Sequence, residues 1–263
     1  MAALDFGPHE RPIDLVFLHA NGFNALTYRR ILEPLGGPFR LLGVDLRGHG
    51  ASSLPAIAEG RAGWNDFRDD VLALLEGLSI EHAVLAGHSM GGTTCLAAAA
   101  LDSRRVRRLV LLDPVIPPRR PIPGAGGHDL VEGARRRRSH FSSKAAVLEA
   151  YAHRRAFAGW AKGMLADYVE AGFHDAPDGG ARLACSPAWE ASNFVLARDL
   201  DAWPALENPP CPVEMIKAER ESTCQCTLPG DNVSVRVVAG ASHFLPMEQP
   251  ELVGAALAHA IGR

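Results

Sequence analysis

Apolar runs typical of strands alternate with helix-like patterns along the first part of the chain. The strand-like runs span residues 13–18, 39–44, 83–86 and 109–112. The helix-like patterns span residues 25–35, 63–78 and 93–101. The apolar runs are continuous rather than alternating, which is typical of parallel strands covered by helices on both faces. The pattern therefore predicts an α/β fold with a mostly parallel, doubly wound sheet, to which residues 3–6 add an antiparallel edge strand.

The pattern changes after Pro114. Prolines and glycines interrupt the chain between residues 117 and 127, and mostly helical patterns then follow to about residue 206. Strand-like runs resume at residues 213–217 and 233–238, and a helix is predicted at residues 250–261. We therefore predict an α/β core formed by residues 1–114 and 207–263. A helical cap inserted at residues 115–206 is expected over the carboxyl edge of the sheet.

A glycine-rich turn, Gly87-His88-Ser89-Met90-Gly91-Gly92, lies between a strand-like run and a helix-like stretch. The pattern places Ser89 at the apex of this turn, in a strained backbone conformation that the flanking glycines accommodate. Such a turn projects the hydroxyl clear of the sheet and points the positive end of the next helix at it. A phosphate-binding loop is disfavoured because its G-x-x-x-x-G-K-[ST] spacing is missing. Ser89 is therefore a candidate nucleophile.

A serine nucleophile requires a general base. His243 is the best candidate, since it follows the strand-like run at residues 233–238 and precedes a helix, at the same sheet edge as Ser89. His88 is expected to point away from the serine and His19 to lie in a neighbouring loop, so both are predicted to have structural roles.

Three carboxylates are candidates for the acid that orients the base. Glu221 follows the strand-like run at residues 213–217 by a short loop and is the preferred candidate. Asp113 ends the preceding strand-like run and is the first alternative, and Glu219 is the second. The acid would fix the imidazole tautomer and stabilise the imidazolium that forms as the serine loses its proton.

The charge that develops on a carbonyl oxygen under attack requires two backbone N–H donors. Met90, directly after the serine, is predicted to supply one of them. The loop at residues 19–23, which follows the first parallel strand, is predicted to supply the other from Asn21.

Composition narrows the class of partner. The chain has 263 residues, 47% of them apolar, and a formal net charge of −3. This size fits one enlarged α/β domain, the charge disfavours nucleic acid, and no apolar run is long enough to span a membrane. Residues 1–13 lack the apolar core of a signal peptide, so a cytoplasmic location and a small-molecule substrate are expected. The sequence carries no prediction of oligomeric state.

The five cysteines are scattered and odd in number, which argues against a disulfide framework. Cys224 and Cys226 bracket one residue, but no second ligand pair lies at a zinc-site spacing. They are predicted to be free thiols in a loop, and neither a metal nor a cofactor is expected.

Residues 135–138 are consecutive arginines with acidic residues nearby in sequence. We predict a solvated helix face for them rather than an anion-binding site. The aromatic residues of the cap either line a substrate pocket or form the core of the cap, and the sequence favours neither. These aromatic residues are Trp160, Tyr168, Phe173, Trp189 and Phe194.

Four motifs, in this order, resemble the α/β-hydrolase family over nearly the whole chain. They are the loop at residues 19–23, the segment Asp45-Leu46-Arg47-Gly48-His49-Gly50-Ala51-Ser52, the turn at residues 87–92 and the tail Ala241-Ser242-His243-Phe244-Leu245-Pro246. The resemblance implies a sheet of about eight strands with a cap inserted after the sixth. It also implies Ser89 as nucleophile, His243 as base and the backbone amides of Asn21 and Met90 as oxyanion hole.

The chain departs from the family pattern at two places. Ala20 stands where the first loop usually carries glycine, and Glu221 stands where the acid after the seventh strand is usually aspartate. Some members place the acid after strand six, which corresponds to Asp113. Dehalogenases and epoxide hydrolases of this family use an aspartate nucleophile, so the serine at position 89 disfavours both. No chemistry is assigned to residues 45–53, which are expected to form a packed loop.

These features lead to the hypothesis of a cofactor-free serine hydrolase that cleaves carboxylic esters, thioesters or lactones of small to medium acyl compounds. The reaction would proceed through an acyl-enzyme on Ser89. One alternative is a C–C bond hydrolase or a cofactor-free perhydrolase of the same fold. Another, from a different class, is a non-catalytic ligand-binding protein on this scaffold, because a fold does not determine a function.

Overall fold

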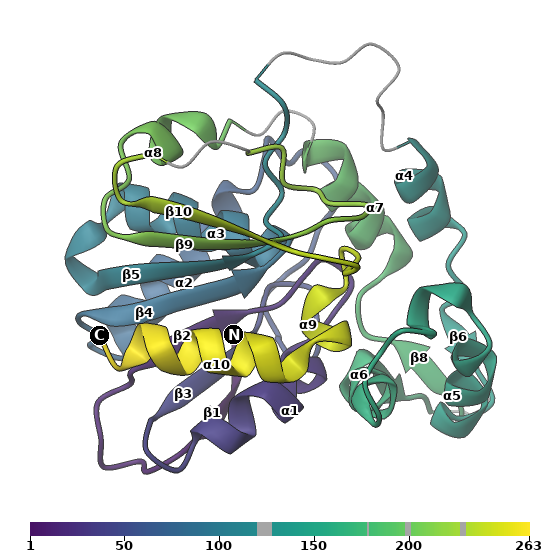
Figure 1. The fold of residues 1–263 in the computed structure, drawn as a ribbon. Helices are drawn as coiled ribbons and strands as arrows, with labels where there is room; N and C mark the ends of the chain where they lie inside the picture. Colours follow the sequence, from purple (N-terminus) through teal and green to yellow (C-terminus); the bar gives the residue numbers. More distant parts are fainter. Residues whose placement is uncertain (120–127, 178, 198–200, 227–229) are drawn as a thin grey trace.

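One sheet organises the molecule. The computed structural model describes residues 1–119, 128–177, 179–197, 201–226 and 230–263. Within these residues, seven strands form a sheet in the order β1-β3-β2-β4-β5-β9-β10 (Figure 1). The strands are β1 Ala2–Phe6, β2 Leu15–Leu18, β3 Leu41–Asp45, β4 Ala83–His88, β5 Val106–Leu112, β9 Val213–Ala218 and β10 Val233–Val238. β1 is antiparallel to β3 and the other neighbours run parallel, which confirms the predicted sheet and its antiparallel edge strand.

The sheet has seven strands in the described part of the chain, fewer than the roughly eight that the resemblance implied. A single antiparallel strand precedes β2, because the chain turns at Gly7 and reaches β2 through a short loop. Gly7 has a φ of +102°, and a Cβ there would lie 2.0 Å from the carbonyl oxygen of Phe39. The turn therefore requires glycine.

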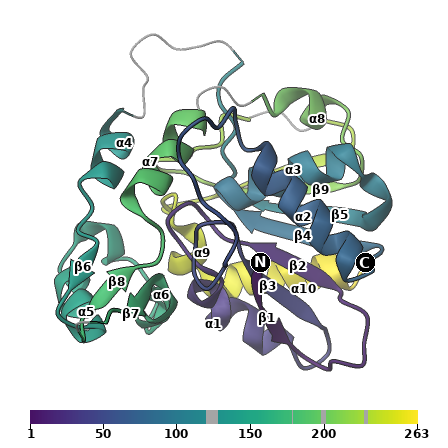
Figure 2. The same ribbon diagram turned by 180° about the vertical axis from the view of Figure 1, so that it is seen from behind.

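The central strands are buried on both faces. In β2, Val16 and Leu18 belong to one apolar core, and Leu15 and Phe17 belong to the opposite one. The helices that contribute to these cores are α1 Arg29–Leu32, α2 Asn65–Gly77, α3 Met90–Leu101 and α10 Pro250–Ile261. α10 crosses the near face of the sheet in Figure 1, and α2 and α3 cross the other face in Figure 2. Burial on both faces explains why the strand runs are continuously apolar.

Residues 115–206, which we call the cap segment, connect β5 to β9. Its helices are α4 His128–Arg135, α5 Lys144–Ala152, α6 Met164–Gly172, α7 Pro187–Leu196 and α8 Trp203–Glu207. It also contains a small antiparallel sheet in the order β6-β8-β7, formed by β6 His140–Phe141, β7 Phe173–Asp175 and β8 Ala181–Leu183. These strands were not predicted, because two or three residues are too few to show a period. The division into a core and an inserted cap stays a prediction.

Two further observations concern the described residues. No helix among them is both long and apolar enough to cross a membrane. The five cysteines are all buried.

Candidate active site

The turn after β4 holds Ser89 in the predicted strained conformation. Its φ is 55° and its ψ is −120°, and a non-glycine residue in such a region costs about 1–3 kcal/mol. A Cβ on Gly87 would lie 2.5 Å from the carbonyl carbon of Gly91, and a Cβ on Gly91 would lie 2.3 Å from the carbonyl oxygen of Leu18. These close backbone approaches require glycine, and they place Ser89 directly before the first turn of α3.

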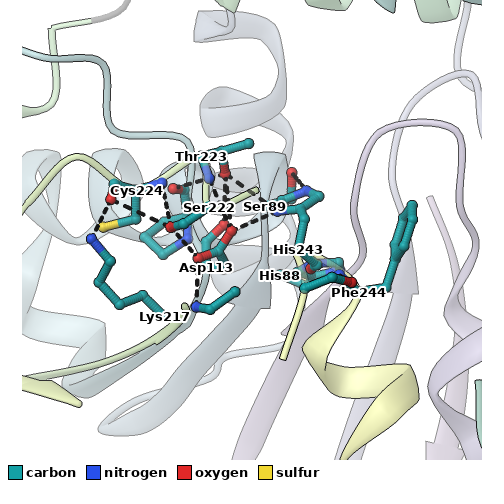
Figure 3. Close-up of polar contacts among 12 residues, drawn as sticks. His88, Ser89, Asp113, Lys217, Ser222, Thr223, Cys224, His243 and Phe244 are labelled. Carbon is teal, nitrogen blue, oxygen red and sulfur yellow. Dashed lines mark hydrogen bonds and ion pairs between the residues drawn. The ribbon is translucent and has the colours of Figure 1, made fainter. Parts of the chain in front are cut away.

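His243 lies between β10 and the short helix α9 Leu245–Glu248, where its imidazole reaches Ser89 (Figure 3). The Nε2 atom of His243 is 3.0 Å from the Oγ of Ser89. The Nδ1 atom is 2.6 Å from the Oδ2 of Asp113. When Nδ1 carries the proton and donates a hydrogen bond to the carboxylate, Nε2 is free to accept a hydrogen bond from the serine hydroxyl. A general base requires this tautomer.

Asp113 follows β5 directly, and its side chain is fully buried. Its Oδ1 accepts hydrogen bonds from the N–H of Ala218 at 2.9 Å and the hydroxyl of Ser222 at 2.6 Å, and its Oδ2 accepts one from the N–H of Thr223 at 3.0 Å. Burial opposes ionisation, but the hydrogen bond and charge of His243, together with the hydrogen bonds from Ser222 and Ala218, hold the pKa of Asp113 below its ordinary value. Asp113 is therefore a carboxylate at neutral pH.

The preferred acid candidate, Glu221, is not the carboxylate that the structure places at His243. Its side chain is exposed, on a turn where its φ is 55°. Glu219 is also exposed, and it accepts the N–H of Gly240 at 2.7 Å. The physical reason is that β5 and β9 are neighbours in the sheet, so the loop after β9 passes over Asp113 and donates hydrogen bonds to it.

A cavity of about 440 Å³ opens beside Ser89 and His243. Asn21 and Met90, the predicted N–H donors, line the same cavity. Met90 is the first residue of α3, and first-turn N–H groups have no partner within their helix. The two residues predicted to supply the N–H donors thus lie at the same cavity as the serine and the histidine.

The cap segment forms the far wall of this cavity. The apolar side chains that it contributes include Leu130, Ala134, Phe194 and Ala197. Trp189 and Phe173, by contrast, are almost fully buried in the apolar cores, so the cap aromatics divide between pocket and core. In the described part of the chain, no group of three or more His, Cys, Asp or Glu residues is arranged to hold a metal ion.

The prediction of a solvated face at residues 135–138 is wrong for Arg137. Its side chain lines the cavity, is only 15% exposed and forms an ion pair of 2.5 Å with Glu190 of α7. It also donates a hydrogen bond to the hydroxyl of Tyr168. Arg135, by contrast, is exposed. The run follows the end of α4, where Glu190 of α7 and Tyr168 of α6 draw this one arginine inward.

The chain is similar to known proteins over most of its length. The model of the alpha/beta hydrolase family matches residues 15–256. The chain belongs to the alpha/beta hydrolase family. A relative from Mesorhizobium japonicum, a 2-(acetamidomethylene)succinate hydrolase, is 28% identical over 249 residues, which cover 90% of this chain and 84% of the relative.

Two further similarities place this alpha/beta hydrolase among its relatives. The crystal structure of an E-2-(acetamidomethylene)succinate hydrolase superposes with a TM-score of 0.79 at 25% identity, covering 99% of this chain and 94% of that one. A 2-hydroxymuconate semialdehyde hydrolase from Pseudomonas sp. CF600 is 35% identical over 102 residues, which cover 37% of this chain and 35% of the relative.

His88 connects two loops of this alpha/beta hydrolase. Burial lowers its pKa to about 3, so the imidazole is neutral. Its Nε2 is 2.8 Å from the carbonyl oxygen of His243, and its Nδ1 is 2.8 Å from the hydroxyl of Tyr28. That hydroxyl in turn accepts the N–H of Ala20 at 3.2 Å. The sequence indicated a structural role for His88 but did not indicate these partners.

His49 was missed by the sequence analysis, which assigned no chemistry to residues 45–53. It is fully buried, and its Nε2 accepts the N–H of Gly22 at 3.0 Å. Burial lowers its pKa well below the ordinary value, so Nδ1 carries the proton and donates to the carbonyl of Arg47 at 2.9 Å. The available signal was topological: this segment follows β3, the neighbour of β2, so it runs beside the loop at residues 19–23.

Proposed function

We propose that the protein is a serine hydrolase that cleaves carboxylic esters or thioesters of small to medium acyl compounds through an acyl-enzyme on Ser89. The observation that carries the proposal is the hydrogen-bonded chain from Asp113 through His243 to Ser89, which ends in the 440 Å³ cavity. Single hydrogen bonds of this kind occur in many folded proteins. The strained backbone of Ser89, however, costs folding free energy, and a serine with a purely structural role would not require that strain.

The proposed reaction follows from the geometry. The Oγ of Ser89 attacks the carbonyl carbon as its proton moves to the Nε2 of His243, and the Asp113 carboxylate stabilises the imidazolium that results. The oxygen of the tetrahedral intermediate gains negative charge and accepts hydrogen bonds from the N–H groups of Asn21 and Met90. Nε2–H then protonates the leaving alcohol or thiol, and a water molecule, activated by the same histidine, hydrolyses the acyl-enzyme.

The cavity supports the proposed substrate size. A volume of about 440 Å³ lies at the lower end of the usual range for small-molecule sites, roughly 300–1,000 Å³. Leu130, Ala134 and Phe194 provide apolar contact for an acyl chain. The Arg137–Glu190 ion pair provides a polar position on the same wall.

A second candidate is hydrolysis of a C–C bond. It is favoured by the similarity to the 2-hydroxymuconate semialdehyde hydrolase, although the aligned part covers 37% of this chain. The same serine, histidine and N–H donors would serve such a reaction, and the two candidates differ in the group that leaves the tetrahedral intermediate.

Labelling and turnover test the proposal together. A fluorophosphonate probe is expected to form one covalent adduct, located on Ser89 by peptide mass spectrometry. p-Nitrophenyl acetate, butyrate and octanoate are expected to be hydrolysed with a burst of nitrophenol, and Ser89→Ala is expected to abolish both labelling and turnover. An adduct without ester turnover would favour the C–C hydrolase. Absence of any adduct on the folded wild-type protein would support the non-catalytic alternative.

A further inference from the structure

The loop at residues 19–23, which we call the oxyanion loop, is held by the cap segment through the side chain of Asn21. The Nδ2 of Asn21 donates to the backbone carbonyl of Glu190 at 3.0 Å. The Oδ1 of Asn21 accepts from the Nδ2 of Asn193 at 2.8 Å. Both partners belong to α7, so the two ends of one planar amide are fixed by one helix.

The direction of these hydrogen bonds is determined by Arg61. Its Nη1 donates to the Oδ1 of Asn193 at 2.6 Å, and arginine has no acceptor. The Oδ1 of Asn193 must therefore face Arg61, and its Nδ2 faces Asn21. Arg61 is itself held by an ion pair of 2.9 Å with Asp66 and lies 3.8 Å above the ring of Trp189. Asn193 is fully buried, so bulk solvent does not reach its amide.

The remaining part of the oxyanion loop is fixed by other elements. The N–H of Gly22 donates to His49 at 3.0 Å, and the carbonyl of Gly22 accepts the hydroxyl of Tyr168 at 3.2 Å. Gly22 has a φ of +75°, and a Cβ there would lie 2.6 Å from the carboxylate of Glu190. α6, through Tyr168, and α7, through Glu190 and Asn193, therefore both contact this loop.

We propose that Asn193 is a positioning residue, which acts through the Asn21 side chain to aim the backbone N–H of Asn21 at the substrate oxygen. The inference rests on the proposed function. The cap segment then has two roles, since α7 both lines the acyl pocket and orients half of the oxyanion hole. Because the stabilisation of an oxyanion depends on donor geometry, loosening this contact lowers kcat more than it weakens substrate binding.

The test replaces one donor with an acceptor. Asn193→Asp keeps the size of the side chain and the acceptor for Arg61, whose positive charge faces the added negative charge, but it cannot donate to Asn21. Ser192→Ala is the matched control, because Ser192 also accepts a hydrogen bond from Arg61, at 2.8 Å, and no described contact joins it to Asn21. Each variant is titrated with the fluorophosphonate probe, so that kcat for p-nitrophenyl butyrate is expressed per active serine. A loss of fold reduces the number of active sites, whereas a misdirected donor lowers kcat per site.

We expect Asn193→Asp to lower kcat per active site about tenfold and to leave KM within about twofold of the wild-type value. The loss in kcat is smaller than the ~10²–10³-fold loss that follows removal of an oxyanion donor, because the donor is misdirected rather than removed. The Ki of an alkylboronic acid, which forms a tetrahedral anion on serine, is expected to rise in parallel. Ser192→Ala is expected to retain wild-type kcat. Equal kcat per site for Asn193→Asp and Ser192→Ala, in a wild-type protein that is labelled and active, would overturn the inference and leave the proposed function standing. A wild-type protein without label or turnover would instead refute the proposed function.

Asn21→Ala provides a second variant. It keeps the backbone N–H of Asn21 and removes both contacts to α7. Where Asn193→Asp does not fold, Asn21→Ala is measured alone, and an unchanged kcat per active site would contradict the inference. We expect a loss of kcat at least as large as that of Asn193→Asp, and no further loss when the two substitutions are combined, because they interrupt the same contact. Additive losses in the double variant would contradict the proposed coupling.

Discussion

Replacement of Asp113 by asparagine tests the hydrogen-bonded chain on which the proposed function depends. The substitution keeps the shape of the side chain, but it removes the negative charge and one acceptor oxygen. Asp113 accepts hydrogen bonds from the N–H of Ala218 on one oxygen and from the N–H of Thr223 on the other. In either orientation of the new amide, its NH₂ group therefore faces one of these N–H groups, and a buried donor loses its partner.

Both orientations impair His243. If the amide nitrogen faces the imidazole, it donates to Nδ1, and the imidazole proton moves to Nε2, which can then no longer accept from Ser89. If the amide oxygen faces the imidazole, the tautomer is kept but the charge that stabilises the imidazolium is lost. The equivalent substitution in a serine protease lowers kcat by ~10⁴, or about 5 kcal/mol of transition-state stabilisation. We expect a loss of this order for Asp113→Asn, and about 1–3 kcal/mol less free energy of unfolding because of the unpaired donor.

The assay is steady-state hydrolysis of p-nitrophenyl butyrate, with the concentration of active serine determined by fluorophosphonate titration and the fold verified by circular dichroism. Glu221→Gln is the control, because Glu221 is an exposed carboxylate at the same edge of the sheet. It is expected to retain kcat within about twofold, since exposed substitutions away from a site have small effects. If Glu221→Gln loses activity by orders of magnitude and Asp113→Asn does not, the assignment of Asp113 is refuted.

Three further predictions concern packing, pH and the pocket. Gly91→Ala is expected to lower the free energy of unfolding, measured by urea titration, by about 3 kcal/mol or more, because its Cβ would lie 2.3 Å from the carbonyl oxygen of Leu18. Gly133→Ala is the control. It has open space around it and is expected to leave the free energy of unfolding unchanged or to raise it. The buried His88 has a folded pKa of about 3 against an ordinary 6.5, so the unfolded state binds more protons between these values and stability falls as pH falls below 6.5. His88→Gln is expected to reduce that slope by about 1.4 kcal/mol per pH unit between pH 4 and 6, and an unchanged slope would contradict a neutral His88. Phe194→Ala, which enlarges the cavity, is expected to raise the octanoate to butyrate ratio of kcat/KM about tenfold, whereas an unchanged ratio would place the acyl chain elsewhere.

The strands of the parallel sheet could be predicted because burial on both faces leaves a local signal. Residues 83–86 of β4 and 109–112 of β5 are uninterrupted apolar runs, since alternate residues enter opposite cores. The turn at Ser89 was equally readable, because its strain and its close backbone approaches require glycines at fixed positions near the serine. The short strands of the cap segment were not readable, because their pairing partners, rather than their own composition, make them strands.

The contacts of the site depended on chain segments that are far apart in sequence. Asp113 and Glu221 both follow strands at the same sheet edge, and the sequence could not show that the loop after β9 donates hydrogen bonds to Asp113 while Glu221 turns to solvent. Asp113 and His243 are 130 residues apart, and their contact exists because β5, β9 and β10 are consecutive in the sheet.

The sequence by itself determined the succession of main-sheet strands and helices along the chain, the strained Ser89 turn and the candidate base, because each is encoded in neighbouring residues. Only the tertiary structure decided which carboxylate meets the imidazole, that Arg137 enters the cavity and that Asn193 holds Asn21 across 172 positions of sequence. The physical reason is that a hydrogen bond between distant side chains forms only where their helices and strands pack together. The two apolar cores determine that packing, and the polar residues do not.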